Sequence, residues 1–315
     1  MHLQENRYAQ FYGVLCLTMA PGAVYRKGMV IRMKAKDVVA QIVKHYGVNI
    51  ELPSTCDGYK AGDPETEVTG VVTSFMATAN VIREAARLGA NMIITHEPTY
   101  FTGNDKTDWC TNDAVYLAKK KLIDETGMVI WRNHDLIHMT QPDGIYDGFI
   151  KEMGWEQYAL PPVEKQFGGE GGMQGFIKGF RDYYDLPQTT LGQLVQEFKQ
   201  KLQMDTLRII GDTAMPCSRV GVLVGGGSLG FGIEELPMQI MEEKGIDVLV
   251  CGEITEWTTC AYIGDAVQLG LPRAMIVLGH ERTEEWGMKH MRPWLEELLS
   301  VPVWFVDAKE PFSYL

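Results

Sequence analysis

The sequence predicts an α/β protein built from two related α/β lobes. From residue 34 onward, segments with apolar residues at helical spacing alternate with short, apolar, β-branched segments, which is the pattern of an α/β architecture. The second observation is an internal repeat, because GANMIITHE at 89–97 resembles GIDVLVCGE at 245–253. The composition agrees: 45% hydrophobic and 22% charged residues are typical of a globular protein, and 315 residues suffice for one large domain or two ordinary ones.

The expected elements run through both halves of the chain. Glycine ends helical segments, as at Gly89, where a left-handed residue is favoured. We expect helices at residues 35–48, 77–90, 114–127, 143–154, 189–203, 233–245, 260–270 and 283–299. We expect strands at 66–75, 91–97, 128–134, 206–212, 246–253, 273–280 and 301–308, with a strand and a glycine-rich turn at 219–228.

We divide the chain into a tail and one domain. The apolar stretch 11–23 has no basic segment before it, which disfavours a secretory signal, so we expect either a flexible tail or an over-long start. The predicted boundaries are residues 1–32 for the tail and 33–315 for the domain, with lobe one at about 33–154, lobe two at about 219–315 and a connecting region at 155–218.

The connecting region contains a glycine-rich stretch, FGGEGGMQGF, at residues 167–176. A phosphate-binding loop of this kind needs a strand before it and a helix directly after it, and the sequence offers neither here. We therefore expect a turn into a strand rather than a phosphate loop.

Charge and cysteine content exclude several classes of protein. A formal charge of −12 argues against nucleic-acid binding, which needs clustered Lys and Arg. No segment approaches the ~20 apolar residues of a membrane helix, so we expect no membrane partner. The six cysteines contain no Cys-x-x-Cys pair, which favours reduced thiols and a cytoplasmic location over a zinc knuckle or a redox dithiol.

The repeat continues into a second pair of segments that carry potential metal ligands. MVIWRNHDLIH at 128–138 aligns with AMIVLGHERTE at 274–284. The alignment pairs His134 with His280 and His138 with Glu284. Each segment therefore places two potential ligands four residues apart, which brings them to one face of a helix.

Several of these side chains directly follow apolar strands, and ligands of parallel sheets collect at the carboxyl ends of the strands. The residues at such strand ends are His96, Glu97, His134, Glu253 and His280. Each alone is more typical of a hydrogen-bonded structural residue. Their co-occurrence at equivalent points of a repeat indicates a metal site, because unpaired buried imidazoles and carboxylates are costly.

Five short motifs occur in a fixed order: ITHEP at 94–98, HDLIH at 134–138, GGGS at 225–228, CGE at 251–253 and GHERTE at 279–284. Together they resemble the Nif-three-like dinuclear metal family, whose bacterial members are often labelled GTP cyclohydrolase I type 2 homologues. The resemblance runs from about residue 33 to the C-terminus. It implies a Nif-three-like fold of two lobes with mixed sheets and a metal site between them.

The resemblance also implies five metal ligands, which are His96, Glu97, His138, His280 and Glu284. The family pattern is His-His-Pro, then His-Thr-Asn-x-Asp, then Gly-His-x-x-(Ser/Thr)-Glu. Glu97 stands where the family has its second His, and His138 stands where it has Asp. Two interpretations remain open. Either the site is retained with exchanged ligand types, or this chain has diverged and has lost one ion or changed its metal preference.

The resemblance implies two divalent ions per subunit, and imidazole and carboxylate ligands without a thiolate suit Fe, Mn, Co or Zn. Such a pair favours hydrolysis, with Glu284 as the bridging carboxylate. His134 and Glu253 are the candidate catalytic residues, His134 as a proton shuttle or ligand-supporting residue and Glu253 as an orienting group.

The resemblance implies a hydrolase of the GTP cyclohydrolase I type 2 kind that acts on a small-molecule substrate such as a nucleotide. It also implies a toroidal homohexamer. Two alternatives remain, a metal-dependent phosphoesterase and a non-enzymatic metal-binding, iron-handling or regulatory interaction protein. The cations Arg132, Arg208 and Arg282 are scattered in the sequence, and no Walker-type loop is present to hold a triphosphate.

Overall fold

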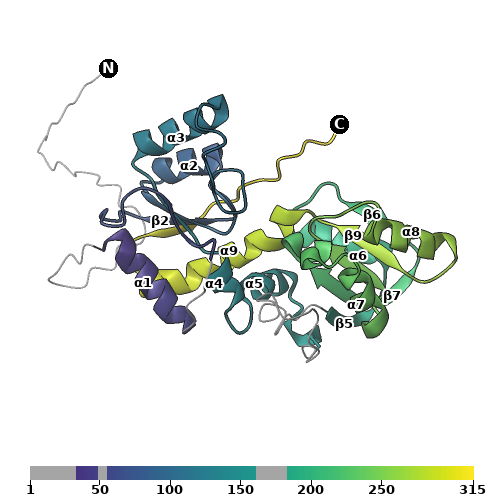
Figure 1. The fold of residues 1–315 in the computed structure, drawn as a ribbon. Helices are drawn as coiled ribbons and strands as arrows, with labels where there is room; N and C mark the ends of the chain where they lie inside the picture. The colour runs from purple at the N-terminus through teal and green to yellow at the C-terminus, as the bar shows by residue number, and fades with distance from the viewer. Residues whose placement is uncertain (1–32, 49–54, 161–182) are drawn as a thin grey trace, which may run out of the picture. The chain divides into compact units, whose positions relative to one another are not determined.

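The computed structural model describes residues 33–48, 55–160 and 183–315. They form an α/β protein with two five-stranded mixed sheets, as predicted (Figure 1). The expected tail at 1–32 and the glycine-rich stretch at 167–176 lie outside the described residues.

The first sheet has the strand order β1-β4-β3-β2-β10. Its strands are β1 (Gly58–Ala61), β2 (Val71–Ser74), β3 (Met92–Thr95), β4 (Val129–Arg132) and β10 (Val303–Phe305). Neighbouring strands are parallel except at the β1 edge, where β1 pairs antiparallel with β4. The carboxyl ends of β2, β3 and β4 therefore meet at one edge of this sheet.

The second sheet has the order β5-β7-β8-β9-β6. Its strands are β5 (Tyr183–Thr190), β6 (Arg208–Ile210), β7 (Pro216–Leu223), β8 (Val248–Cys251) and β9 (Ala274–Val277). The central strands β7, β8 and β9 are parallel, and the two edge strands are antiparallel to their neighbours. β8 and β9 occupy the places that β3 and β4 occupy in the first sheet, which matches the sequence repeat.

The predicted lobe boundaries differ from the sheets in two places. The last strand, β10, was predicted within lobe two but pairs with β2 of the first sheet. In addition, β5 and β6 of the predicted connecting region belong to the second sheet. Both differences have one cause, because strand pairing over long sequence separations is decided by packing and cannot be read from local periodicity.

Nine α-helices and two short 3₁₀ helices are described. The helices are α1 (Ala35–Tyr46), α2 (Ala79–Arg87), α3 (Ala114–Thr126), α4 (Asp135–His138), α5 (Gly144–Met153), α6 (Leu191–Lys201), α7 (Leu236–Lys244), α8 (Thr259–Gln268), α9 (His280–Leu298), η1 (Glu156–Tyr158) and η3 (Gly225–Gly232). Capping follows the sequence: the Asp113 carboxylate accepts hydrogen bonds from the first turn of α3, and Gly127 ends that helix with φ +61°.

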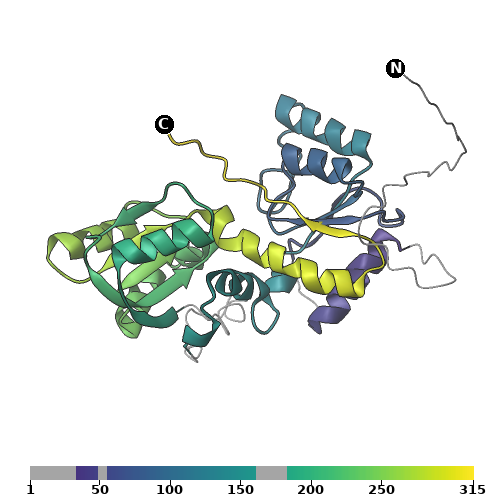
Figure 2. The same cartoon turned by 180° about the vertical axis from the view of Figure 1, so that it is seen from behind.

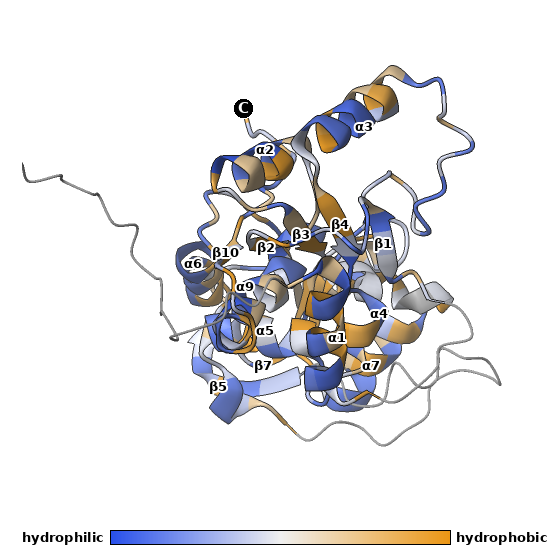
Figure 3. Ribbon diagram, turned by 90° about the vertical axis from the view of Figure 1, so that its left-hand side faces the viewer, coloured by the Kyte–Doolittle hydropathy of each residue, from blue (hydrophilic) through white to orange (hydrophobic). Residues whose placement is uncertain are grey.

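Each sheet buries one face under its own helices and the other against a shared central core. Ile93 of β3 packs with α2 and α3, whereas Met92 and Ile94 join a central cluster that includes α5 and α9. Leu249 of β8 likewise packs with α7 and α8. Strands buried on both faces read as continuous apolar runs, and β3 and β4 are largely hydrophobic in Figure 3. Fully burying one such aliphatic side chain stabilises the fold by about 1.5–3 kcal/mol.

Helix α9 connects the two sheets. It begins directly after β9 of the second sheet and leads into β10 of the first sheet. Figures 1 and 2 show it in yellow, running from the strands of the second sheet to a position beside β2. Its first turn therefore lies where the carboxyl end of a second-sheet strand approaches those of the first sheet.

The cysteines and the possible membrane-spanning helices can be compared with the sequence expectations. The five described cysteines are free, and Cys251 is fully buried within β8. None of the helices in the described part of the chain has both the length and the hydropathy needed to cross a bilayer.

Helices α5 and α9 approach each other through two glycines. A Cβ atom added at Gly148 would lie 2.5 Å from the Gly287 Cα, and one added at Gly287 would lie 2.7 Å from the Ile145 Cα. Both distances are to backbone atoms, which cannot rotate away. The crossing of the two helices therefore requires the absence of side chains at these positions.

We expect Gly148→Ala to destabilise the protein by about 1–3 kcal/mol, because it overpacks the α5–α9 contact. Gly264→Ala in α8 is the control, since no atom lies within 4 Å of its added Cβ. That change should stabilise by about 0.5–1 kcal/mol through helix propensity. Urea unfolding of both variants measures the difference, and equal midpoints would contradict the tight crossing.

Candidate metal centre

The polar side chains predicted at strand ends converge from both sheets. His96 and Glu97 follow β3, and the His134–His138 segment follows β4. His280 and Glu284 come from the first turn of α9, directly after β9. The site thus lies where the carboxyl ends of parallel strands from the two sheets meet.

His96 and Glu284 form the most buried part of the cluster. His96 Nε2 lies 3.3 Å from Glu284 Oε2, and His280 Nε2 lies 2.9 Å from the same oxygen. Despite these distances, His96 Nε2 and Glu284 Oε2 are buried and have no hydrogen-bond partner. The distances between these atoms are short, but their angles do not meet the geometry of a hydrogen bond. Buried polar atoms are usually hydrogen-bonded, so this imidazole nitrogen and this carboxylate oxygen are free to bind another partner.

The spacing of these atoms fits a metal ion. Ligand atoms at about 2.0–2.2 Å from one ion stand about 2.8–3.1 Å apart in octahedral geometry and about 3.3–3.6 Å apart in tetrahedral geometry. Glu97 Oε1 lies 3.4 Å from His280 Nε2, which adds a third pair at such a distance. One donor atom each from His96, Glu97 and Glu284 lies within 4.8 Å of the others, and the same holds for His96, His134 and His138. The residues present therefore fit divalent metal ions.

Glu97 is anchored by an arginine of the neighbouring strand. Arg132 Nη2 donates to Glu97 Oε2 at 3.0 Å, and Arg132 Nε donates to the main-chain oxygen of His96 at 2.9 Å. Burial opposes ionisation of Glu97, but the contact with His280, whose Nε2 lies 3.4 Å from Glu97 Oε1, outweighs it and lowers the pKa of Glu97 to about 2. The carboxylate is therefore ionised, with Oε1 directed toward the other ligands.

His280 lies among three carboxylates. Its Nδ1 is 3.0 Å from Glu253 Oε1, while its Nε2 faces Glu97 and Glu284. Burial disfavours the charged ring, but these carboxylates, Glu284 foremost, raise the pKa of His280 to about 12. The contact with His280 lowers the pKa of Glu253. A metal ion at Nε2 would replace a proton there, which couples metal binding to proton release.

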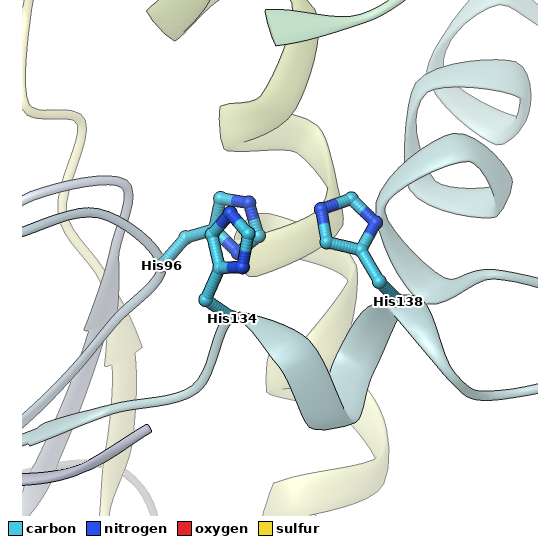
Figure 4. Close-up of side chains that lie close together, drawn as sticks. All are labelled: His96, His134 and His138. Atoms are coloured by element: carbon cyan, nitrogen blue, oxygen red, sulfur yellow. The ribbon is translucent and has the colours of Figure 1, made fainter. Parts of the chain in front are cut away.

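His138 is held by the cap of the next helix. Its Nδ1 lies 2.8 Å from Asp143 Oδ2, and Asp143 Oδ1 accepts hydrogen bonds from Ile145 N and Tyr146 N of α5. Burial lowers the pKa of His138, but the Asp143 carboxylate outweighs it and raises that pKa to about 9. This contact at Nδ1 presents the opposite ring nitrogen to the other histidines, toward which one nitrogen of His138 points in Figure 4.

His134 stacks on His96. Their ring centroids are 4.5 Å apart with an interplanar angle of 17°, whereas the His138 ring is tilted 66° from His96 (Figure 4). Imidazole lone pairs lie in the ring plane, so two stacked rings cannot aim at one point, while His96 and His138 can. Burial and the neighbouring His134 lower the pKa of His96, which favours the neutral ring that a metal binds.

The short helix α4, which follows His134, is fixed by a side chain from another segment. Asp57 Oδ1 accepts hydrogen bonds from His134 N at 2.5 Å and Asp135 N at 2.9 Å. Asp57 Oδ2 accepts from Leu136 N. This carboxylate caps the first turn of α4 and so fixes where the His134 and His138 side chains begin.

Gly225 lies against the ligands from the second sheet. It follows β7 with φ +50°, and a Cβ atom there would lie 1.8 Å from Glu284 Oε1 and 2.6 Å from His280 Nε2. Its N–H donates to Thr283 Oγ1 at 2.9 Å. The missing side chain at Gly225 therefore leaves room for the Glu284 and His280 side chains.

All seven predicted site residues lie in or beside this cluster, with Glu253 at its edge through His280. Sequence reasoning missed the roles of Arg132, Asp143 and Asp57, because their partners lie on other elements. Arg132 had been considered as a phosphate contact, but its side chain is buried and bonds Glu97. The only feature of the sequence that pointed to this role is the position of Arg132, a cation at the end of β4 beside the predicted site.

A two-sheet α/β protein with a buried histidine and glutamate centre is the class that these observations define. The chain belongs to the Duf34/NIF3 (NGG1p interacting factor 3) family, whose model matches residues 33–311. This confirms the predicted family.

Two curated relatives carry the name GTP cyclohydrolase 1 type 2 homolog. The relative from Clostridium perfringens is 23% identical over 289 residues, covering 90% of this chain and 100% of that protein. The relative from Clostridium acetobutylicum is 25% identical over 253 residues, covering 80% of this chain and 85% of that protein. The chain is therefore a homologue of these proteins over most of its length.

Solved structures share the fold. A hypothetical protein of Staphylococcus aureus matches with a TM-score of 0.66 and 22% identity, over 90% of this chain and 100% of that one. A Bacillus cereus protein related to NIF3 matches with a TM-score of 0.67 and 18% identity, over 90% and 99% of the two chains. At these identities the similarity shows the fold alone.

We expect Gly225→Ala to weaken metal binding by about 10–100-fold, the range found when groups that support a ligand are lost, because its Cβ displaces the Glu284 carboxylate. Equilibrium dialysis with metal analysis measures the affinity. Gly226→Ala is the matched neighbour, since its Cβ meets nothing within 4 Å. Equal affinities for the two variants would show that Gly225 does not shape the centre.

Proposed function

We propose that this chain binds two divalent transition-metal ions and is a metal-dependent hydrolase of the GTP cyclohydrolase 1 type 2 kind. The observation that carries the proposal is the pair of buried, unpartnered atoms His96 Nε2 and Glu284 Oε2. The proposed ligands are His96, Glu97, His138, His280 and Glu284. Their chemistry, imidazole and carboxylate without thiolate, suits Fe, Mn, Co or Zn.

Glu284 is the proposed bridging ligand, because its Oε2 lies within 3.3 Å of both His96 and His280. Divalent ions held by these residues would supply Lewis-acid activation of water and of the bond to be cleaved. Glu253 holds His280 through Nδ1, which leaves Nε2 to face the centre. Its contribution is therefore the orientation of a ligand.

His134 is the proposed proton-transfer residue. Its ring is a quarter exposed, its Nδ1 lies 2.9 Å from Asp135 Oδ1, and its Nε2 lies 3.6 Å from Glu97 Oε1. Asp135 fixes the ring orientation, while the partial exposure allows exchange of a proton with solvent. Stacking on His96 keeps the His134 ring beside the proposed ligands. Because the two rings are nearly parallel, their nitrogen lone pairs do not point to the same ion.

The substrate and the assembly rest on the family. A small molecule such as a nucleotide is the proposed substrate, and a homohexamer is the proposed assembly. Two of the three arginines that could meet a triphosphate are paired with carboxylates, Arg132 with Glu97 and Arg282 with Glu281 and Glu285. Cyclic-amide or phosphoester bonds in less highly charged molecules therefore belong in the substrate test.

A second candidate function is metal binding without catalysis, as in an iron-handling or regulatory interaction protein. One observation favours testing it. A hollow of about 270 Å³ beside α1, α4 and α9, lined by residues including Tyr46, Pro142 and Trp294, contains none of the proposed ligands. A binding surface of this kind can serve recognition separately from the centre.

Metal analysis of protein purified without chelators tests the proposal first. We expect about two divalent ions per chain. His96→Ala and Glu284→Gln should lose them, whereas His290→Ala should not, because His290 lies on the same helix but pairs with Glu152. A wild-type protein that contains and takes up no metal would refute the proposed function.

Turnover on a panel of nucleotides, cyclic amides and phosphoesters tests catalysis. Metal-dependent turnover should fall by about 10²–10⁴-fold in His134→Ala, the usual contribution of a proton-transfer residue, while the metal content is retained. Bound metal with no turnover on any of these substrates would favour the non-enzymatic candidate.

A further inference from the structure

The donor atoms form two groups of different chemistry that share His96. One group is His96, His134 and His138, and the other is His96, Glu97 and Glu284. The first contains only imidazoles, and the second contains two carboxylates. Because His134 stacks on His96 and one imidazole nitrogen binds one ion, the donors of the imidazole-rich position are His96 and His138, and those of the carboxylate-rich position are Glu97 and Glu284. Imidazole suits ions such as Zn²⁺, whereas carboxylate suits Mn²⁺, so the two groups favour different ions.

Asp143 supports the imidazole group from one side. Its carboxylate is buried, with one oxygen 2.8 Å from His138 Nδ1, while the other oxygen accepts from the N–H groups of Ile145 and Tyr146 in the first turn of α5. The helix cap thus fixes the carboxylate, and the carboxylate fixes the His138 ring. A carboxylate at Nδ1 also makes the opposite ring nitrogen a stronger donor.

Arg132 supports the carboxylate group from the other side. Its guanidinium is 3% exposed and donates to Glu97 Oε2 at 3.0 Å, to the His96 main-chain oxygen at 2.9 Å and to the Gly103 main-chain oxygen at 2.5 Å. It therefore clamps the loop after β3 as well as the carboxylate. With Oε2 held, Oε1 is the oxygen that faces His280.

We propose that Asp143 and Arg132 are positioning residues that create two unlike ion positions. Asp143 sets an imidazole-rich position through His138, and Arg132 sets a carboxylate-rich position through Glu97. This inference rests on the proposed function, because it requires that the centre binds two ions. Asp143 bonds the side chain of His138, and Arg132 bonds the side chain of Glu97 and the main-chain oxygen of His96. No ligand side chain is bonded by both supporting residues, so the two side-chain contacts can be removed separately.

The wild-type protein provides the first test. Metal-free protein is titrated with Co²⁺ and followed by visible absorption, which depends on the ligands of each ion. We expect the titration to show two steps with different spectra. In competition experiments, Zn²⁺ should displace Co²⁺ first from the imidazole-rich position, and Mn²⁺ should compete only at the carboxylate-rich position. A single step with one spectrum, or two steps with identical spectra, would overturn the proposal without any variant being made.

Asp143→Asn then removes the charge while retaining a side chain that caps helices well. We expect about 10–100-fold weaker binding in the imidazole-rich step alone. The matched control is Asp113→Asn, because Asp113 caps α3 through Val115 N and Tyr116 N in the same manner. This control should leave both steps unchanged.

Arg132→Met removes the clamp on Glu97, and we expect about 10–100-fold weaker binding in the carboxylate-rich step alone. Arg132→Lys should recover only part of the loss, because lysine keeps the charge but lacks the fork of donors. The control is Arg219→Met, since Arg219 bonds the Asp185 carboxylate and the Lys244 main-chain oxygen in the second sheet.

The outcomes separate this inference from the proposed function. If the wild type binds no metal, both fail. If it binds two ions but Asp143→Asn and Arg132→Met weaken both steps alike, the inference fails and the metal centre stands. Should either variant fail to fold, the wild-type Co²⁺ titration decides the question.

Discussion

The burial of charged and polar side chains in the interior is the constraint on which the rest of this structure depends. His96 Nε2 and Glu284 Oε2 are buried without hydrogen-bond partners, and His280 and Glu97 add further charge around them. Leaving such groups unpaired in a protein interior costs several kcal/mol. A divalent cation bound at this site would offset the cost, and metal binding would then also stabilise the surrounding fold.

Helix α9 makes this arrangement possible by joining the two sheets. It starts at the carboxyl end of β9 with His280 and Glu284 and ends before β10, which pairs in the first sheet. The ligands of one sheet are thereby placed against His96 and Glu97 of the other. The glycines at the α5–α9 crossing have a structural role in the same arrangement, because they bring α5, and with it the Asp143 cap, close to α9.

The two ligands that depart from the family pattern each have a buried partner of opposite charge. Glu97 is held by Arg132, and His138 is held by Asp143. An exchange of ligand type changes the charge that the neighbourhood must balance, and these partners supply that balance. Each of these two proposed ligands is therefore held by a buried side chain on a different element.

The sequence by itself determined the class of fold, the repeat and the positions of the strand-end ligands, because apolar periodicity and ligand spacing are local properties of the chain. It placed β10 in the wrong lobe and did not identify the partners Arg132, Asp143 and Asp57. Those contacts join residues on different elements, and Asp57 reaches His134 across 77 residues. Only the tertiary structure decided which side chains meet, since strand pairing and the burial of charge depend on packing between distant segments.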